Sequence, residues 1–478
     1  MLGKTVQIRL EDVYDGVLDK VEERPPELIA LLEEHIDFEK LATLEFRRAF
    51  YAVTGRNHKH HLVSILKLLI LQKILGIPTD KLMLTILTLS RELREFCGFE
   101  TVPDASLLSR FRERYLSYLQ SVFEMLVDMT EPICREIDAR KSSYLIFDTT
   151  GIEAPVKENN PKFMNTKLKE AKKFQKDHPD YNPYAGVYKL LPDEASANPE
   201  IRQQYINGHY CYALKAGIVT NGLGIVRHIS VFDDEFRRKH PETISQKTED
   251  PDKDKEIGDS TSLKPVLSEF FAAHLDFYEN RCFKTFIGDS SFDSYDNYTM
   301  LRDTFRFERV CVPMNPRNSG KSYDTAFAAD GTPICPVDHT PFRYAGECGG
   351  KQRSRRMKWI CHKSIRIGNT RICTCEHPCT DSHYGKCVYT YPDKNFRLYP
   401  GIARGTEHWD NLYRHRVQIE RTIHIFKDTF ALDARRSFSS AVLKADLVMA
   451  GISQLVAVLL AKAIASLKLF KSVRKICA

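Results

Sequence analysis

The sequence predicts an α/β fold in which a mixed β-sheet is flanked by helices. A helical N-terminal domain precedes this sheet, and a Cys-rich insertion interrupts it before the final functional helix. Three observations support the prediction: helical apolar spacing before residue 135, short apolar runs that end in acidic residues, and a dense group of cysteines between residues 335 and 387. Apolar runs of strand length that alternate with helical patterns are typical of a sheet covered by helices.

The chain is expected to divide into four parts. These are a helical N-terminal domain (1–135), the first part of the sheet domain (140–314), a basic Cys/His-rich insertion (315–400), and the second part of the sheet domain (401–478). A length of 478 residues leaves room for two or three domains. The hydrophobic content of 42% is that of an ordinary globular protein.

The N-terminal domain is predicted to be helical. The segment 61–76 is apolar on most sides and is expected to form a buried helix. Two further helical segments follow, 80–99 and 104–129, and Asp104 is a good N-cap for the second. Three arginines lie near the start of that helix: Arg110, Arg112 and Arg114. The region is either a helix-turn-helix-like DNA-binding unit or a helical bundle that supports a dimer.

Two acidic residues follow buried strands of the predicted sheet. Asp148 comes directly after the apolar run 144–147, and Asp289 follows the run 283–287. Each alone is an ordinary strand-end residue. Together they are well placed to reach a shared site, where two metal ions would lie about 3.5–4 Å apart.

Between the two acids, the segments 209–220 and 223–232 are strand-like, and Asn221-Gly222 separates them. An Asn-Gly pair between two such runs predicts a hairpin with a type I′ turn. A helix is expected over 262–278. The order of strand, hairpin, helix and strand indicates a mixed sheet flanked by helices.

The segment Leu412 to Phe430 is predicted to be an amphipathic helix. At 100° per residue, its polar residues Tyr413, Arg416, Glu420 and Lys427 fall within about 60° of one face. Taken alone, this is an ordinary solvated face with Glu–Arg and Glu–Lys pairs. Beside Asp148 and Asp289, it offers a third carboxylate for Mg²⁺ and cations for a phosphodiester backbone.

These residues resemble the DDE transposases of bacterial insertion sequences. The spacing Tyr413-x2-Arg416-x3-Glu420-x6-Lys427 matches their Tyr-Arg-Glu-Lys signature, and FDTTGIEA and IGDSSFDSYDNY resemble their two Asp regions. The likeness extends from about residue 40 to about residue 455. One departure is that Ser290 and Ser291 stand where the family often has Gly.

The resemblance implies a ribonuclease H-like catalytic domain with Asp148, Asp289 and Glu420 as catalytic, metal-binding residues. Two Mg²⁺ (or Mn²⁺) ions would be the cofactors of DNA cleavage and strand transfer. Tyr413, Arg416 and Lys427 would contact transposon-end DNA. Two alternatives remain: a nuclease of the same fold without strand transfer, and a domesticated DNA-binding protein without catalysis.

The resemblance also implies the partners, namely double-stranded DNA carrying the terminal inverted repeats, target DNA, and a second copy of the chain as a homodimer during the reaction. The expected location is cytoplasmic and nucleoid-associated, with no membrane. The apolar segment 447–461 is shorter than the about 20 residues that span a bilayer. It is therefore expected to form a buried helix that packs on the sheet.

The charge pattern suits a nucleic-acid partner. The net charge is +7 and the pI is about 8.6. The run Lys351–Arg371 holds eight Lys or Arg and no acidic residue, and it is either a solvated face or a DNA-facing patch. Trp359 favours the folded patch, with these predicted DNA contacts: Arg353, Arg355, Arg356 and Lys358. A second Lys-rich stretch, 157–176, is either a flexible loop or a further DNA contact.

Cysteines cluster in the insertion, where seven of the 13 fall between Cys335 and Cys387. They are either ordinary reduced cysteines or ligands of one tetrahedral Zn²⁺. The candidate ligands are Cys335, Cys361, Cys373, Cys375 and Cys379, with His339, His362, His377 and His383 nearby. The set of four expected from these candidates is Cys335, Cys361, Cys373 and Cys379. Because the insertion has little apolar periodicity, metal or DNA is expected to be needed to order it.

Overall fold

The fold is described from a computed structural model, which covers residues 27–51, 58–206, 209–245, 257–315, 327–328, 330–350 and 353–471. The chain divides into two compact units. One combines Met1–Ile133 with Ile425–Ala478, and the other comprises Cys134–His424. We call them the helical unit and the sheet unit. The four-part division expected from the sequence remains a prediction.

The helical unit is built from helices, several of which begin at a side-chain cap. The elements are α2 (Glu27–His35), α3 (Phe38–Leu41), α4 (Leu44–Phe50), α5 (Leu62–Ile74), α6 (Asp80–Leu89), α7 (Arg91–Cys97), α8 (Ala105–Arg114), the first part of α9 (Leu116–Ser142), the π-helical η7 (Ile425–Thr429), α18 (Ser440–Ala463) and the 3-10 helix η8 (Leu467–Leu469). The Asp104 side chain accepts a hydrogen bond from the Leu107 amide, which confirms the predicted cap. The predicted helix over 80–99 is interrupted at Ser90, which caps α7 through the Leu93 amide.

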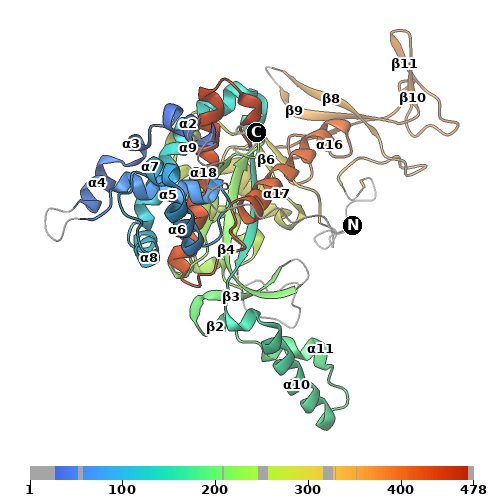
Figure 1. The fold of residues 1–478 in the computed structure, drawn as a ribbon. Helices are drawn as coiled ribbons and strands as arrows, with labels where there is room; N and C mark the ends of the chain where they lie inside the picture. Colours follow the sequence, from blue (N-terminus) through green and yellow to red (C-terminus); the bar gives the residue numbers. More distant parts are fainter. Residues whose placement is uncertain are drawn as a thin grey trace, which may run out of the picture. The chain divides into compact units, whose positions relative to one another are not determined.

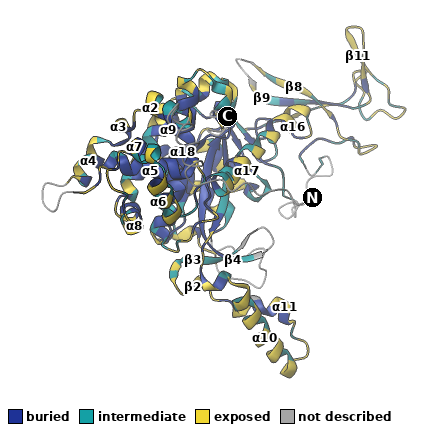
Figure 2. Cartoon of the chain, viewed as in Figure 1, coloured by how far each residue is buried: buried dark blue, intermediate teal, exposed yellow. Residues whose placement is uncertain are grey.

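Helix α18 forms the centre of the helical unit. Nearly all of its side chains are buried, and it packs against α5 and α8 (Figures 1 and 2). It is the one described helix whose length and apolar composition would allow it to cross a membrane. The expected buried helix is therefore confirmed and is longer than 447–461. Its extensive contacts inside the unit are with helices, whereas packing on the sheet was expected.

Charged side chains are enclosed between these helices. Asp446 on α18 lies 3.0 Å from Lys73 Nζ, 3.2 Å from Arg112 Nε and 2.6 Å from Arg435 Nε. Arg112 also donates to both carboxylate oxygens of Asp80, at 2.7 and 2.9 Å. Arg112 is thus fully buried and is not available to contact DNA, whichever of the two interpretations of this region holds.

The sheet unit contains a seven-stranded mixed sheet. Its order is β2 (Glu194–Ala195), β3 (Asn198–Ile206), β4 (His209–Asn221), β1 (Tyr144–Glu153), β6 (Thr285–Ile287) and β7 (Arg309–Cys311), with β5 (Val226–Val231) also paired to β4. The start of β4 pairs with β3 and its end with β5, both along one side. Strand β1 pairs antiparallel to β4 and parallel to β6, which itself runs parallel to β7. The predicted α/β class with a mixed sheet is confirmed.

The predicted hairpin is present, but its turn differs from the prediction. Residues 222–225 connect β4 to β5, and the Asn221 side chain accepts hydrogen bonds from the amides of Leu223 and Ile225. A type I′ turn needs a positive φ at both central residues. Here the positive φ is at Gly224 (+77°), so the connection is a longer turn organised by the Asn221 side chain.

Helices α13 (Asp259–Ala273) and α17 (Val417–His424) cover opposite faces of the sheet. Phe147 and Val266 of α13 both lie against Gly217, and Thr149 donates a hydrogen bond to Asp259 at the start of α13. Asp148 lies between Phe147 and Thr149 on β1 and therefore points to the other face, because successive strand residues alternate. On that face it meets Arg416, which directly precedes α17.

The other helices of the sheet unit are short, apart from one. They are η1 (Lys157–Asn159), α10 (Pro161–Asp177), α11 (Pro183–Gly186), η2 (Val187–Leu190), α12 (Asp234–Lys239), η3 (Pro241–Thr243), α14 (Leu275–Glu279), η4 (Ser290–Phe292), α15 (Tyr295–Asp303), α16 (Glu407–Tyr413) and η6 (Arg414–Arg416). Helix α10 spans most of the Lys-rich stretch, so the flexible-loop interpretation is wrong. Figures 1 and 2 show α10 extending beyond β2 and β3 with a largely exposed surface.

The Cys-rich insertion folds into two small sheets. One contains β8 (Arg343–Gly350), β9 (Arg353–Ile360) and β12 (Cys387–Thr390), and the other pairs β10 (Ser364–Ile367) with β11 (Thr370–Cys373). Trp359 is buried among Phe342, Met357 and Tyr399, and its indole N–H donates to Thr390 Oγ1 at 2.9 Å. The insertion therefore has a small apolar core, and Trp359 belongs to that core. The expectation that Trp359 marks a folded segment is confirmed, and a DNA-facing role of this segment stays a prediction.

Candidate active site

Two acidic residues emerge side by side from the middle of the sheet. In the parallel pair β1 and β6, Ile146 lies opposite Ile287. Asp148 and Asp289 each come two residues after this pair in the sequence. The register therefore brings the two predicted carboxylates to the same end of the two strands. Asp289 caps η4, and its carboxylate accepts hydrogen bonds from the amide and the hydroxyl of Ser291. The departure at Ser291 therefore has a structural role, since this side chain orients Asp289.

The third predicted acid, Glu420, reaches the same place from α17. Arg416 links it to the sheet: Nη1 of Arg416 donates to Glu420 Oε1 at 2.6 Å, and Nη2 lies 3.5 Å from Asp148 Oδ2. About half of the Glu420 side chain is exposed, whereas Asp148 is 20% exposed. An ordinary ion pair between Arg416 and Glu420 was the alternative interpretation of this face. That ion pair is present, and it lies beside the Asp148 carboxylate.

The surroundings of Asp148 disfavour its charge. Burial raises the pKa of Asp148 to about 6, and the nearby charges of Asp289 and Asp259 add to the rise, while Arg416 opposes it. The charges of Asp289 and Glu420 likewise contribute to the raised pKa of Tyr413, after burial as the main cause. These mutual effects indicate that Asp148, Asp289, Glu420, Arg416 and Tyr413 share one electrostatic environment.

A buried ion pair behind the site was not anticipated from the sequence. Lys215 on β4 lies 2.7 Å from Asp259 Oδ1 and donates to the carbonyl of Ile257 at 2.6 Å. Thr149, next to Asp148, donates to the same Asp259 oxygen. One sequence signal was available, namely a lysine inside the apolar strand β4, because lysine is almost never buried without a partner.

Helix α17 is held against the sheet by a close contact at the hairpin. Thr422 Oγ1 donates to the Gly224 carbonyl at 2.7 Å. A Cβ added at Gly224 would lie 3.2 Å from the Gln418 carbonyl oxygen and 3.3 Å from Thr422 Oγ1, in a backbone conformation that favours glycine. The glycine at this turn therefore allows α17 to approach closely and fixes the position of Glu420.

The segment 412–430 is not one regular helix. Tyr413 ends α16, Arg416 lies in the 3-10 turn η6, Glu420 lies in α17, and Lys427 follows in the π-helical η7. Because 3-10 and π turns change the number of residues per turn, the single regular face assumed from a period of 3.6 is wrong. Lys427 belongs to the helical unit, where its Nζ lies 3.9 Å from Asp433.

The donor set at this site suits a hard divalent cation. Carboxylates, of which the site has three, are the ligand type that Mg²⁺ prefers. A cation would also offset the repulsion between the like charges of Asp148 and Asp289. The Arg416 guanidinium already supplies positive charge there, between Asp148 and Glu420. Among the described residues, no three His, Cys, Asp or Glu side chains stand close enough to hold a metal ion. The chemistry fits the metal, and Glu420 would have to leave Arg416 to become a ligand.

The insertion gathers several of the predicted zinc-binding thiols. Cys335 and Cys361 are buried in its apolar core, and Cys375 packs against that core. A hydrogen bond with Cys373, together with burial and the charge of Cys361, raises the pKa of the Cys375 thiol to about 12. Burial and the charges of Cys335 and Cys361 are among the causes of the raised pKa of Cys379. Cys375, a candidate ligand that the expected set of four left out, thus packs against the core, and its neighbour Cys373 is not among the residues of that core.

The four residues of β9 that are predicted to contact DNA differ from one another in their surroundings. Arg355 forms a two-point ion pair with Glu347, at 2.7 and 2.9 Å, on the neighbouring strand β8. The Arg356 guanidinium lies over the Tyr389 ring, 4.5 Å from its centroid. Arg353 begins the strand, and Lys358 pairs with Tyr389 in the register. A DNA-binding role for Arg353, Arg355, Arg356 and Lys358 stays a prediction.

Comparison with known protein families gives two matches. Residues 140–455 match the family described as "Transposase DDE domain", and residues 17–114 match the one described as "Transposase domain (DUF772)". The first match contains Asp148, Asp289 and Glu420, and the second contains α2 to α8 of the helical unit. No curated protein matches the chain.

Proposed function

This chain belongs to the transposase family that carries a DDE domain, and from that premise we propose that it cuts and joins DNA with Asp148, Asp289 and Glu420 as its catalytic acids. It is an insertion-sequence transposase that acts on DNA. The observation that carries the proposal is the register of β1 and β6, which presents Asp148 and Asp289 together on one edge, with Glu420 linked to Asp148 through Arg416. The mixed sheet supports a ribonuclease H-like catalytic domain.

The three carboxylates would hold two Mg²⁺ or Mn²⁺ ions, which would activate the attacking oxygen and stabilise the leaving 3′-oxygen. Asp148, which is mostly buried, would be one of the residues that hold these ions. Glu420 lies on a helix and is half exposed, so it can exchange its Arg416 partner for a metal. Arg416, once released from Glu420, would be free to neutralise a non-bridging phosphate oxygen.

The residues around the acids would position the DNA. The Tyr413 phenol keeps its proton at neutral pH, since tyrosine ordinarily has a pKa of about 10 and burial raises it further, and so it can donate a hydrogen bond to a phosphate. Lys427 follows one helical segment later, and we propose it as a further phosphate contact. The Tyr-Arg-Glu-Lys spacing supports these assignments, together with a homodimer during the reaction, because two transposon ends must be joined.

The proposal is tested with purified full-length protein and DNA carrying the element's own ends. We expect Mg²⁺-dependent cleavage at the ends and joined products when an end with a free 3′-hydroxyl is supplied. Cleavage without joining would replace strand transfer with a nuclease activity. Salt-sensitive binding with neither reaction would overturn the catalytic proposal and favour a domesticated DNA-binding protein.

We also propose that the insertion binds one structural Zn²⁺. The proposed set keeps three ligands from the sequence prediction, namely Cys335, Cys361 and Cys379. Cys375 replaces Cys373 as the fourth ligand, because it packs on the core that contains Cys335 and Cys361. Four thiolates are a common tetrahedral set for structural zinc. Since no three described donors stand at metal-holding distances, binding would have to draw the thiols together.

Zinc content measured by mass spectrometry checks this proposal. Protein purified without chelator should contain about one zinc per chain, and Cys361→Ser or Cys375→Ser should remove most of it. Cys387→Ser is the matched control, because this thiol is exposed on β12 of the same insertion, and its zinc content should stay unchanged. Wild-type protein without zinc, or loss of zinc in the Cys373→Ser variant alone, would contradict this ligand set.

A further inference from the structure

Helix α10 carries a row of lysines along one side. At 100° per residue, four of its lysines fall within about 60° of one another around the helix axis. We call this row the lysine face, and it consists of Lys162, Lys169, Lys173 and Lys176. All four side chains are exposed, and within the described part of the chain none of them forms an ion pair. At a rise of 1.5 Å per residue, the row is about 21 Å long.

The opposite side of α10 holds the helix in place. Leu168 is half-buried there and Ala171 fully buried, and α10 contacts α11 and η2. At the base of the helix, the Asn159 side chain accepts a hydrogen bond from the Tyr212 amide at 2.7 Å. It also donates to the carbonyls of Tyr212 at 2.8 Å and Ala154 at 2.7 Å. Because α10 is packed on one side and anchored at its base, the lysine face is held toward solvent (Figure 2).

The charge of the lysine face is not offset within the helix. The two acids of α10, Glu170 and Asp177, lie outside the arc of these lysines, and Glu170 already pairs with Lys167 at 2.9 Å. Lys169 and Lys173 are four residues apart, a spacing at which like charges destabilise a helix. A bound polyanion would relieve this repulsion.

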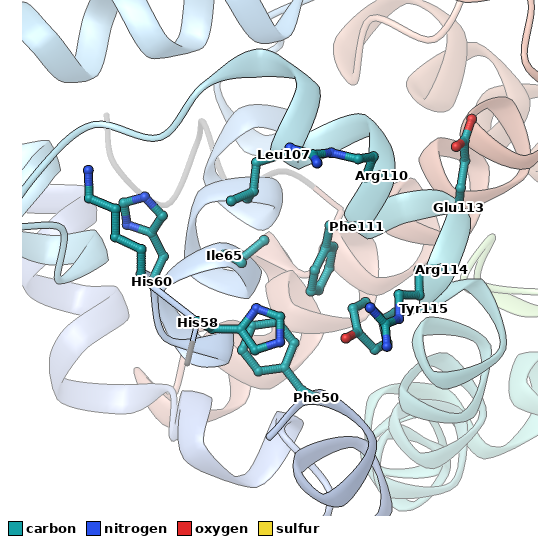
Figure 3. A pocket seen from close by; sticks show the side chains of 11 residues that line it. Phe50, His58, His60, Ile65, Leu107, Arg110, Phe111, Glu113, Arg114 and Tyr115 are labelled. Carbon is teal, nitrogen blue, oxygen red and sulfur yellow. The ribbon is translucent and has the colours of Figure 1, made fainter. Parts of the chain in front are cut away.

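Cations of the helical unit have a different setting. Lys59, Arg110 and Arg114 line a cavity of about 570 Å³ together with the acid Glu113 (Figure 3). Phe111 in the wall of this cavity is only 3% exposed, so its ring offers little surface to a ligand. An acid shares this cavity, whereas the lysine face is an open row of one charge.

We propose that the lysine face binds the phosphate backbone of duplex DNA on both sides of a groove, without reading the bases. A row about 21 Å long exceeds the width of the major groove, which is about 12 Å, so its two ends can reach both flanking backbones. Lysine binds phosphate as a point charge, and phosphates carry no sequence information. The proposal rests on the function above only in taking DNA as the partner, and it needs no metal.

This contact would lie apart from the acidic site. Strand β1 continues from Asp148 to Glu153, a distance of about 17 Å at 3.4 Å per residue, before the chain reaches η1 and α10. The lysine face would therefore add affinity for DNA at a place that the three acids do not occupy.

The test measures the anisotropy of labelled duplex DNA with full-length protein in EDTA, over a range of salt concentrations. Each phosphate contact made by a lysine contributes about one unit to the slope of log K against log salt. The double variant Lys169→Gln/Lys173→Gln should flatten this slope by about 2 and weaken binding about 5- to 50-fold at about 0.1 M salt. The loss should be equal for transposon-end DNA and for an unrelated duplex of the same length.

The fold of this variant should be intact. Gln forms helices about as well as Lys, and the substitutions remove like-charge repulsion, so the melting temperature should equal or exceed that of the wild type. A large fall in melting temperature would contradict the repulsion from which the proposal is argued.

Lys239→Gln/Lys264→Gln is the matched control, since it removes the same charge from exposed lysines of α12 and α13. Its slope should match that of the wild type. An unchanged slope in Lys169→Gln/Lys173→Gln, or an equal change in the control, would overturn the proposal. A loss confined to transposon-end DNA would overturn it in favour of base recognition. Because the assay contains no metal, failure of DNA cleavage leaves this result unaffected.

Discussion

Replacing Asp148 with Asn is expected to lower Mg²⁺-dependent cleavage of transposon-end DNA at least about 100-fold. Asn keeps the shape of the side chain but removes the charge that would hold two cations. The measurement is the rate of single-turnover cleavage at saturating Mg²⁺, with DNA binding by the variant measured separately.

The same substitution should not destabilise the fold. Burial raises the pKa of Asp148 to about 6, so ionising this carboxyl costs the folded state free energy; the cost grows as the pH rises from the unfolded pKa of 3.8 and is fully present above about 6. Removing the charge relieves this cost, and the melting temperature of Asp148→Asn at pH 7.5 should equal or exceed that of the wild type. A loss of cleavage accompanied by a large fall in melting temperature would therefore speak against a catalytic role.

Asp276→Asn is the matched control, since Asp276 is exposed on α14 of the same unit. Its cleavage rate and melting temperature should both match those of the wild type. Glu420→Gln completes the series: it removes the ion pair with Arg416 and the third carboxylate, and cleavage should again fall while DNA binding persists. Cleavage at the wild-type rate in Asp148→Asn would remove the basis of the proposed active site.

Much of the sheet could be predicted from the sequence, because it depends on local pattern. The apolar run before Asp148 forms the first part of β1, which continues through Asp148 to Glu153, whereas Asp148 was expected to follow the strand. The run before Asp289 contains β6, and the Asn221-Gly222 pair marks the hairpin. The turn type was missed, because it depends on the contact between Gly224 and α17, and this contact joins residues about 200 positions apart.

Long-range packing also explains the other differences. A helical period assumes uniform geometry, and it fails at η6 and η7, where the chain turns more tightly and then more widely. The sequence predicts a buried helix over 447–461, but the grouping of α18 with α5 and α8 depends on tertiary contacts that no local pattern records. Arg112 looked like its neighbours Arg110 and Arg114, and only the position of Asp446 in the fold separates them.

Asp446→Asn is expected to destabilise the helical unit by about 3–5 kcal/mol, because it leaves three cations buried without their central carboxylate. Asp446 is fully buried, and Lys73, Arg112 and Arg435 all contact it. Burial alone would raise the pKa of Asp446, but these three cations outweigh that effect and hold its pKa far below the ordinary value. The free energy of unfolding, obtained from urea denaturation, is the measurement.

The sign of the pH dependence follows from that lowered pKa. A carboxylate with a depressed folded-state pKa contributes stability in full above its unfolded pKa of about 3.8, and this contribution is lost as the pH falls toward the folded pKa. The difference between wild type and Asp446→Asn should therefore be the same at pH 7.5 and pH 5.0. Glu33→Gln, at an exposed site on α2, should change stability by less than about 0.5 kcal/mol. A variant at Asp446 as stable as this control would mean that the buried cations have found other partners.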